Sequence, residues 1–581
     1  MSFDSTPIPE NTFARALADN ISSVVSTPES IDALRKLIVS FALAGRFSKS
    51  AAIEQSQGEL LDRTRTNHLE DVNHRNRKSP IVEQHPVSPE EIPHEGLSNL
   101  SWIRLSAVCD VEKGNTPILK AVPGPFPLVT TGEQRGTHSD YQFDAEAVIV
   151  PLVSSTGHGH ASLKRLHFQA GRFALGNILC AIIPRDSEAL SARFLYEFLS
   201  AYKDELLVAR MSGTANVSLT INKILDVPIP IIPVDAQRRV CELMGLCDEL
   251  AARQAAQREK RQRLVGATLN RLVSPLNPAE FPTHAHRFRN HFDQLFDTPT
   301  TIPQLRQTIL QLAVQGQLVP QDPDDEPVDT LLRRLVDEKE RLQKSGEFKL
   351  QDGPVAVADK EKLFAIPHSW KWVRAADLSF PISSGSTPAK DVFQETSEKG
   401  VPYLKVYNIR NQKIDFDYCP QFIRKPHHDA KMKRSKLVPG MVVLNIVGPP
   451  LGKTAIVPPT FPEWNCNQAI AFFRLVGDVL PEYIHLYFCA GLFLRNIELI
   501  GTAGQDNISV TKCKNIVIPL PPLAEQKRIV TKVTELLSLC DALEAKLTQT
   551  ESASTKLLSA AVHHLLNESS REGAKPRREK P

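Results

Sequence analysis

The stretch Gly448-Pro-Pro-Leu-Gly452-Lys453-Thr454 is the segment whose residue types come nearest to nucleotide chemistry. A phosphate-binding loop of the Walker type needs four residues between its glycines, whereas three stand between them here. Its two prolines lack the N–H groups that such a loop directs at phosphate. The Ala-Ile-Val-Pro that follows is typical of a short strand, so no helix N-terminus is available to hold an anion. We therefore expect a tight hairpin here and no bound nucleotide.

Histidines and cysteines are the other groups that could do chemistry. No histidine pair has a further ligand at metal-binding spacing, so we interpret these side chains as solvent-exposed or core residues. The pairs are His158 and His160, His284 and His286, His427 and His428, and His563 and His564. Nine cysteines occur without a Cys-x-x-Cys pair, which indicates neither a zinc site nor a disulfide framework. With no methyltransferase motif and no nuclease-like cluster either, the sequence predicts no catalytic residue, no metal and no cofactor.

Length and composition limit the possible classes of protein. At 581 residues the chain is too long for one core, and about three to five compact units are expected. No apolar run approaches the roughly 18–20 residues that span a bilayer, and the N-terminus lacks a basic-then-apolar signal sequence. Together with the cysteine usage, this predicts a reducing, cytoplasmic location. The net charge of +3 does not by itself indicate a nucleic-acid partner.

An internal repeat organises the chain. GTANVSLTINKILDVPIPIIPVDAQRRVCELMGLCDEL begins at Gly213, and GTAGQDNISVTKCKNIVIPLPPLAEQKRIVTKVTELLSLCDAL begins at Gly501. We align Asn-x-Ser-x-Thr at 216–220 with the same pattern at 507–511. Each copy is typical of an alternating strand, a proline-terminated extended segment and a long amphipathic helix. Cys247 and Cys540, in matching Leu-Cys-Asp triplets, are expected to pack on the apolar faces of these helices.

A second set of matching segments lies upstream of each copy. The pattern Leu-Arg-x-x-Ile-x-x-x-Ala-x-x-Gly begins at Leu34 and again at Leu305, an offset of 305 − 34 = 271. The same offset relates the Gly-x-Thr-Pro turns at 114–117 and 385–388. Two tandem half-units imply internal pseudo-twofold symmetry.

The repeat divides the chain into segments. Trp102 and Trp370, which we match at an offset of 268, begin two globular domains. We expect helices over 30–47, 192–210, 303–319 and 328–344, strands in PLVTTGEQRG and AVIVPLVSSTG, and a C-cap at Gly45. The segments are an N-terminal helical region and linker (1–98), domain 1 (99–235), a first long helix (236–273), a linker with the repeated helical segment (274–367), domain 2 (368–522), a second long helix (523–567) and a disordered tail (568–581).

The two long helices are each polar on most sides, which predicts that they pair along a narrow seam as in an antiparallel coiled coil. The predicted seam joins Val240, Leu243, Leu246 and Leu250 to Leu536, Leu539, Leu543 and Leu547. Between the glutamine and the Leu-Cys-Asp triplet the first helix has eight residues (238–245) and the second has twelve (527–538). The difference of about one helical turn keeps the seam nearly in phase.

These motifs together resemble the specificity subunit of a type I restriction–modification system. The resemblance rests on LRQTILQLAVQGQLVPQDPDDEPVDTLLRRL, on GSTP and on the repeated Gly-Thr-Ala and Leu-Cys-Asp segments, and it covers both halves from about residue 30. It implies an α+β fold in which two pseudo-repeated target-recognition domains of mixed α/β structure are separated by two long antiparallel coiled-coil helices. Each domain is then expected to read one half of a split sequence in double-stranded DNA.

The resemblance also implies which partners carry the chemistry. The helices are expected to dock two methyltransferase (M) subunits, with restriction (R) subunits joining outside them. S-adenosylmethionine for adenine methylation, and ATP with Mg²⁺ for translocation and cleavage, would then be held by those partners and not by this chain.

Residues that could read bases follow the Gly-x-Thr-Pro turn in both domains. Asn, Gln and Arg side chains offer the bidentate patterns that distinguish adenine and guanine. The candidate DNA-binding residues are Thr116, Lys120, Thr130, Thr131, Gln134, Arg135 and His138 in domain 1, and Thr387, Lys390, Tyr407, Asn408, Arg410, Gln412, Lys413 and Lys453 in domain 2. For any single residue a solvated turn is an equal alternative.

A basic run in domain 2 has two interpretations as well. Arg424, Lys425, Lys431, Lys433, Arg434 and Lys436 stand close to His427 and His428. Such a run is commonly a solvated face, and in a domain that touches DNA it would neutralise phosphates.

Three functions remain open on the sequence alone. A non-catalytic DNA-recognition and assembly subunit agrees with every motif above. A self-contained DNA methyltransferase or nuclease would need a cofactor loop that the sequence does not show. A helical scaffold without DNA contact would leave the base-reading residue types unexplained.

Overall fold

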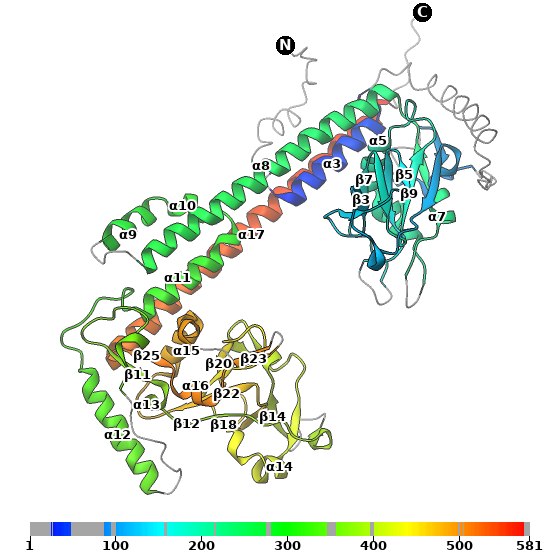
Figure 1. The fold of residues 1–581 in the computed structure, drawn as a ribbon. Helices are drawn as coiled ribbons and strands as arrows, with labels where there is room; N and C mark the ends of the chain where they lie inside the picture. Colours follow the sequence, from blue (N-terminus) through cyan, green and yellow to red (C-terminus); the bar gives the residue numbers. More distant parts are fainter. Residues whose placement is uncertain are drawn as a thin grey trace, which may run out of the picture. The chain divides into compact units, whose positions relative to one another are not determined.

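The computed structural model describes residues 25, 27–47, 86–93, 100–155, 160–213, 217–274, 280–345, 356–394, 400–497, 500–502 and 505–573 (Figure 1). These form two compact units, residues 1–258 with 549–581 and residues 259–548. The chain passes from the first unit to the second along the long helix α8 (Val234–Val273) and returns along α17 (Leu523–Gly573). Among the described residues, no helix is both long and apolar enough to cross a membrane.

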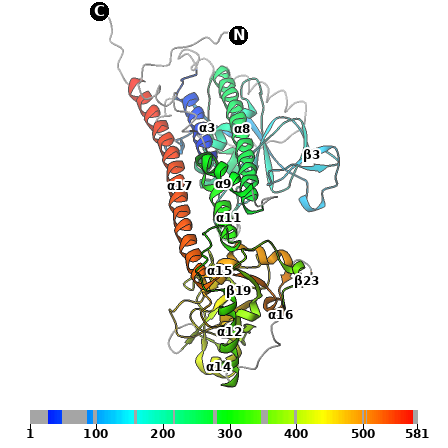
Figure 2. The ribbon, with the colours of Figure 1, turned by 90° about the vertical axis from the view of Figure 1, so that its left-hand side faces the viewer.

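In the first unit, α8 packs against the short helix α3 (Pro28–Leu43) (Figures 1 and 2). The helix α3 begins at Thr27, whose side chain accepts a hydrogen bond from the backbone N–H of Ser30, as an N-cap does. It ends before Gly45, whose φ of 71° supplies the left-handed turn that stops a helix and confirms the predicted terminator. Arg35 forms an ion pair of 2.6 Å with Asp248 of α8.

The second unit repeats this arrangement with other residues. The short helix α11 (Ile302–Val314) lies along the first part of α17, and Arg306 forms an ion pair of 2.6 Å with Asp541. Arg35 and Arg306 occupy equivalent positions, as do Asp248 and Asp541 of the Leu-Cys-Asp triplets. The aspartate of each triplet therefore fixes a short helix to a long one, a role that the sequence pattern did not reveal.

The two central leucines of the predicted helix seam do not belong to the core of either unit. Leu246 and Leu539 are 59% and 66% exposed. A helix turns by about 100° per residue, so the neighbouring cysteine of each triplet faces inward while the leucine faces outward. The cores of the two units take Val240, Met244 and Cys247 from α8 and Ile529, Val533 and Cys540 from α17. The remaining seam positions are partly buried against these cores: Leu243, Leu250, Leu536, Leu543 and Leu547. The burial of Cys247 and Cys540 is confirmed, whereas the antiparallel pairing of the eight seam positions would join the two units and stays a prediction.

Domain 1 is built on two four-stranded sheets. The first has the order β2-β9-β6-β7, with bounds Cys109–Lys113, Leu179–Pro184, Ala147–Pro151 and His167–Gln169. The second has the order β4-β3-β8-β5, with bounds Gly136–His138, Phe126–Val129, Arg172–Leu175 and Phe143–Asp144. Within the second sheet β3 and β8 are parallel. Helix α5 (Ala192–Ala201) shares one apolar core with the first sheet.

Domain 2 repeats the same plan. Its first sheet has the order β12-β22-β19-β20, with bounds Ser379–Ser384, Ile470–Leu475, Val442–Asn445 and Thr454–Ile456. Its second has the order β13-β17-β14-β21-β18, with bounds Phe393–Gln394, Phe422–Arg424, Gly400–Leu404, Trp464–Cys466 and Lys436–Leu437. Strands β14 and β21 are parallel, as β3 and β8 are in domain 1. Helix α15 (Pro481–Ala490) takes the place of α5.

Each domain is closed by a pair of short antiparallel strands. In domain 1, β1 (Trp102–Arg104) pairs with β10 (Pro228–Pro230), and in domain 2, β11 (Lys371–Arg374) pairs with β25 (Val517–Leu520). The last residue of β1 and of β11 is a buried arginine. Arg104 donates two hydrogen bonds to the Glu91 carboxylate and one to the Asp226 carbonyl, which precedes β10. Arg374 likewise donates two to the Glu361 carboxylate and one to the Asn515 carbonyl, which precedes β25.

The Gly-x-Thr-Pro turns have a steric cause. A Cβ atom on Gly114 would overlap the carbonyl oxygens of Gly176 and Leu175, and one on Gly385 would overlap those of Cys466 and Asn467. In each domain the turn passes directly over the end of a parallel strand. Only glycine allows two backbones to approach this closely.

Strand registers correct one of our alignments, and helix caps correct another. Trp102 is opposite Pro230 and Trp372 is opposite Pro519, so Trp102 is equivalent to Trp372, not to Trp370. The expected strand after each Gly-Thr-Ala is interrupted by a short helix, α7 (Ile221–Leu225) or α16 (Val510–Lys514). Thr220 caps the first and Ser509 caps the second, so the Asn-x-Ser-x-Thr motifs are equivalent with a shift of two residues. Their threonine and serine side chains accept from backbone N–H groups, which favours a helix over the alternating strand.

The remaining elements agree with most expectations. Helix α12 has the predicted bounds Val328–Lys344, whereas the segment predicted as one helix over 192–210 is divided into α5, α6 (Lys203–Leu206) and a short 3₁₀ turn, Val208–Arg210. The other elements are α9 (Phe281–Asn290), α10 (Phe292–Leu295), α13 (Ala375–Leu378), α14 (Lys425–Ala430), β15 (Ile409–Arg410), β16 (Lys413–Ile414), β23 (Ile500–Thr502) and β24 (Gln505–Asn507). Helix α17 continues beyond its predicted end at 567 to Gly573, through residues 568–573 of the predicted tail, and the rest of that tail lies outside the described residues. Of the predicted linker before residue 98, residues 86–93 are described and contain a 3₁₀ turn, Pro89–Glu91.

Candidate nucleic-acid interface

The predicted base-reading segments occupy equivalent places in the two domains. Residues 130–135 connect the parallel strand β3 to its neighbour β4, and residues 405–421 connect the parallel strand β14 to its neighbour β17. The sequence comparison that paired these two segments is therefore correct in the fold. Each segment leaves the end of a sheet strand, so a rigid platform supports it.

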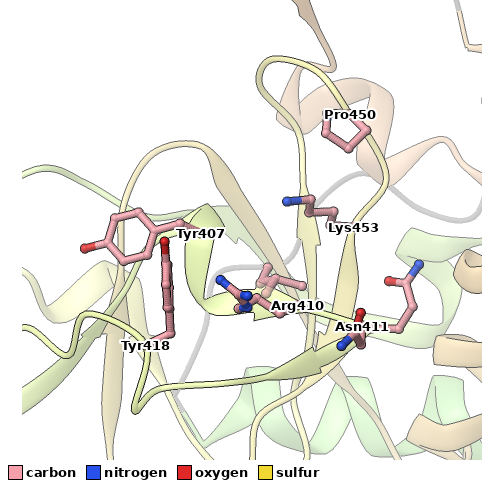
Figure 3. A pocket seen from close by; sticks show the side chains of 8 residues that line it. Tyr407, Arg410, Asn411, Tyr418, Pro450 and Lys453 are labelled. Carbon is pink, nitrogen blue, oxygen red and sulfur yellow. The ribbon is translucent and has the colours of Figure 1, made fainter. Parts of the chain in front are cut away.

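In domain 2 this connection forms one wall of an open hollow of about 550 Å³ (Figure 3). The hairpin of β15 and β16 turns at Asn411 and Gln412, whose φ angles are 49° and 58°. Two successive residues with positive φ give the tight turn whose twist matches a two-stranded hairpin. The hollow is lined by Tyr407, Ile409, Arg410, Asn411, Gln412, Tyr418, Pro450 and Lys453.

Arg410 is held at this wall by two neighbours. Its guanidinium carbon lies 4.0 Å from the centroid of the Tyr418 ring, and its Nε lies 3.4 Å from a carboxylate oxygen of Asp415. Figure 3 shows the guanidinium beside the ring, facing the hollow. Stacking on an aromatic face fixes the plane of the guanidinium group.

The opposite wall is the loop between β19 and β20, which contains the Gly448–Thr454 stretch. These strands pair antiparallel, so the predicted hairpin is confirmed. The Gln412 Oε1 accepts a hydrogen bond of 3.0 Å from the Thr454 N–H and thereby ties the two walls together. Lys453 extends its ammonium group into the same hollow (Figure 3).

Two of the candidate residues are buried and cannot reach DNA. Asn408 is fully buried, and its side chain accepts from the Lys405 N–H and donates to the Tyr418 carbonyl. Thr116 is 5% exposed and lies beside the glycine turn at Gly114. Its N–H donates a hydrogen bond to the Leu175 carbonyl, and its carbonyl accepts one from the Asn177 N–H. Polar side chains beside a sharp turn serve the turn itself, and the sequence does not distinguish this from a role in binding.

The other candidates of domain 2 are placed at the surface. Lys390 and Lys413 are exposed, and Tyr407 is half-buried with its ring 6.3 Å from that of Tyr418. Thr387 is exposed and donates a hydrogen bond to Gln468, so it is partly used within the turn. The accessible candidates of this domain are thus gathered on its turns and loops.

Domain 1 presents a simpler surface. Lys120, Thr131 and Gln134 are exposed, whereas Thr130 accepts a hydrogen bond from the Gly132 N–H and the ring of His138 contacts the backbone of Asp140. Lys120 lies in a 3₁₀ turn before β3, residues 130–134 lie in the connection between β3 and β4, and His138 is the last residue of β4.

Arg135 is used inside domain 1. Its Nε donates a hydrogen bond of 3.0 Å to Gln169, and its terminal nitrogens reach His167 and the Phe168 carbonyl. The imidazole of His167 is buried, and burial together with the nearby arginines lowers its pKa to about 4. The neutral ring therefore accommodates the guanidinium. Sequence reasoning missed His167 because it comes from a strand far along the chain.

The basic run of domain 2 is partly neutralised. Lys436 forms ion pairs with Asp429 at 2.7 Å and with Glu463 at 3.4 Å, and Lys425 lies 3.3 Å from Glu463. The structure also brings buried His428 within 3.3 Å of Glu463, a grouping that the sequence spacing did not reveal. Two lysines already balance the two carboxylates, which favours an ion-pair network over a metal site. Arg424, Lys431, Lys433 and Arg434 are exposed.

Comparison with known proteins identifies the family. The profile described as Type I restriction modification DNA specificity domain matches residues 99–253 and 367–550. The chain is 26% identical to the EcoEI specificity subunit of a type I restriction enzyme of Escherichia coli, over 92% of this chain and 94% of that protein. It is 25% identical to the corresponding EcoAI subunit of Escherichia coli, over 88% and 90%.

A solved structure gives a weaker likeness. A chain from a structure concerned with complex assembly and conformational transition of the type I R-M system is 16% identical to this chain. It covers 81% of this chain and 98% of its own, with a TM-score of 0.47.

The chain belongs to the type I restriction–modification specificity family. Both matched segments contain one globular domain and the first part of the long helix that follows it, as the repeat predicts. The chain is a non-catalytic DNA-recognition subunit that acts with DNA and with other subunits of a restriction–modification complex. The alternative of a self-contained DNA methyltransferase or nuclease is thereby excluded.

Proposed function

We propose that domain 1 and domain 2 each read one half of a bipartite sequence in double-stranded DNA. The observation that carries this proposal is the repetition of one frame around two different connections. Both domains have matching closing strands, a matching glycine turn and two sheets of the same plan, of which the second has four strands in domain 1 and five in domain 2. Each domain has exposed polar residues in the connection that follows β3 or β14. Two domains with a matching fold and different connecting loops are suited to recognising two different DNA sequences.

Each long helix exposes a leucine at the same place of the repeat. Leu246 and Leu539 occupy the same place in the two Leu-Cys-Asp triplets and are both exposed. An exposed leucine alone is unremarkable, but a matched pair on two repeated helices supports two equivalent docking surfaces. We propose that each surface docks one methyltransferase (M) subunit and that restriction (R) subunits join outside them, in the cytoplasm.

In this proposal the partners hold the cofactors. S-adenosylmethionine for adenine methylation, and ATP with Mg²⁺ for translocation and cleavage, would be bound by M and R subunits. Calorimetric titration with S-adenosylmethionine should accordingly give no heat of binding with this chain alone and a saturable signal with its complex with M subunits. Binding by the chain alone would contradict this division of labour.

Selection from a random pool of DNA duplexes tests the reading function. The complex of this chain with M subunits should enrich sequences in which two specified segments are separated by unspecified base pairs. Selection of one continuous segment, or of no sequence at all, would contradict two separate readers.

A further inference from the structure

We propose that Arg410 reads a guanine in the half-site of domain 2, held in the reading position by Tyr418 and Asp415. This inference rests on the proposed DNA-reading function and names the base that one residue recognises. It starts from the hollow of about 550 Å³ between the β15–β16 hairpin and the β19–β20 loop.

The free atoms of Arg410 match the major-groove edge of guanine. Asp415 engages the Nε side of the guanidinium group, and Tyr418 covers one of its faces. Within the part of the chain that the structure describes, the two terminal nitrogens of Arg410 donate no hydrogen bond to protein atoms. Two parallel N–H donors at the end of a planar group match the O6 and N7 acceptors of guanine, which is the commonest specific contact of arginine with DNA.

Its neighbours favour a base over a phosphate as the partner of Arg410. The nearby Asp415 carboxylate partly offsets the positive charge, which weakens a purely electrostatic attraction but leaves hydrogen-bond geometry intact. Lys453 on the facing loop has no carboxylate partner among the described residues, and its ammonium group enters the same hollow. A compact, unpaired ammonium group is suited to a phosphate. The hollow thus offers one contact to a DNA base, from Arg410, and one contact to a DNA phosphate, from Lys453.

The wall that carries Arg410 is also preorganised. The hydrogen bond from the Thr454 N–H to Gln412 fixes the hairpin against the facing loop. The Tyr418 N–H donates to Asp415, which orients the carboxylate toward Arg410. Domain 1 has no equivalent among its described residues, because Arg135 turns inward to Gln169.

The experiment uses the complex of this chain with M subunits and the target selected from random duplexes. Each guanine of the target is replaced in turn by 7-deazaguanine, which lacks the N7 acceptor. At one guanine the replacement should lower the affinity of the unaltered complex by about fivefold or more, within the 5- to 150-fold range expected for a bidentate base contact. With Arg410→Ala the same replacement should change nothing further, because the donor is already gone.

Lys453→Ala is the matched control from the facing wall. It should weaken binding to all sequences alike, reduce the salt dependence of binding by about one phosphate contact, and keep full sensitivity to 7-deazaguanine. Tyr418→Leu should reduce discrimination at the same guanine, whereas Tyr418→Phe, which keeps the ring, should retain it.

Several results would overturn the inference. It is wrong if no guanine of the target is sensitive to 7-deazaguanine, or if Arg410→Ala leaves that sensitivity unchanged. It is also wrong if Arg410→Ala weakens all sequences equally, because Arg410 then contacts a phosphate. If the unaltered complex selects no sequence, the proposed reading function fails and this inference with it.

Discussion

Domain 1 and domain 2 share a framework, which consists of the closing strands, the glycine turn and two sheets. They differ in the side chains that this framework holds at the surface. In both, a buried arginine closes the domain and a glycine turn crosses the end of one parallel strand, β8 or β21. The connection after the other parallel strand, β3 or β14, carries the exposed polar residues. In domain 1 the arginine of this connection, Arg135, bonds inward to Gln169. In domain 2 the arginine, Arg410, stacks on Tyr418 at the edge of a hollow. Backbone constraints therefore fix the shared framework, while side chains in one connection set the surface that we propose contacts DNA.

The largest effect is expected when the buried arginine that closes a domain is replaced, in one domain at a time. Arg104→Ala should destabilise domain 1 by about 3 kcal/mol, at the lower end for a broken buried ion pair, because the Glu91 side chain keeps 28% exposure. Arg374→Ala should destabilise domain 2 to a similar extent. Hydrogen exchange followed by mass spectrometry should show faster exchange in the altered domain only. Faster exchange in both domains would show that the frames are not independent.

Acid should affect the same ion pair. The hydrogen bonds from Arg104 lower the pKa of Glu91 to about 2, well below its usual value of 4.5. A carboxylate whose pKa is lowered in the folded state stabilises that state above the unfolded pKa and stops doing so as the pH falls through the folded one. The stability of domain 1 should therefore decrease between about pH 4.5 and 2, and Arg104→Ala should flatten this decrease. An unchanged pH profile in the variant would contradict the assignment.

A smaller effect comes from the glycine turns. Gly114→Ala and Gly385→Ala should each cost about 1–3 kcal/mol, because a Cβ atom would overlap backbone carbonyl oxygens. Gly245→Ala in α8 is the matched control, since its Cβ would meet no atom within 4 Å. It should stabilise the exposed helix by about 1 kcal/mol. Thermal unfolding measures all three, and a tolerated Gly385→Ala beside a costly Gly114→Ala would show that the turns are not equivalent.

The smallest effect concerns the exposed leucines of the long helices. Leu246→Ala and Leu539→Ala should change stability by less than about 0.5 kcal/mol, whereas Ile529→Ala in the same helix as Leu539 should cost about 2–5 kcal/mol. If the two leucines dock M subunits, their replacement should weaken copurification of M subunits without unfolding the chain. Large losses of stability would instead favour the buried seam predicted from the sequence.

The repeat made most of the fold predictable from the sequence. Duplicated motifs located both domains and both long helices, and α12 has its predicted bounds. The errors occurred where local chemistry overrides periodicity. Thr220 and Ser509 cap short helices inside expected strands, and the apolar side chains that anchor the long helices place Leu246 and Leu539 outside the cores of their units.

The candidate site was predicted less well than the fold. The sequence located the correct connections, and Arg410, Gln412, Lys413 and Lys453 lie where a ligand could reach them. Asn408 and Thr116 are buried beside turns, and the Asn408 side chain bonds to the backbone there. The spacing of residues along the sequence does not reveal such a role. Tyr418, Asp415 and His167 escaped notice because their roles depend on contacts made only in the folded domain.

An exchange of domains tests the central claim most directly. Residues 101–230 would be replaced by residues 371–519, with junctions in the matching closing strands β1–β10 and β11–β25. If each domain reads its own half, methylation mapping with M subunits should find a target built from two copies of the half-site of domain 2. A folded exchange chain that still directs methylation to the original target, or to one with unlike halves, would contradict the account.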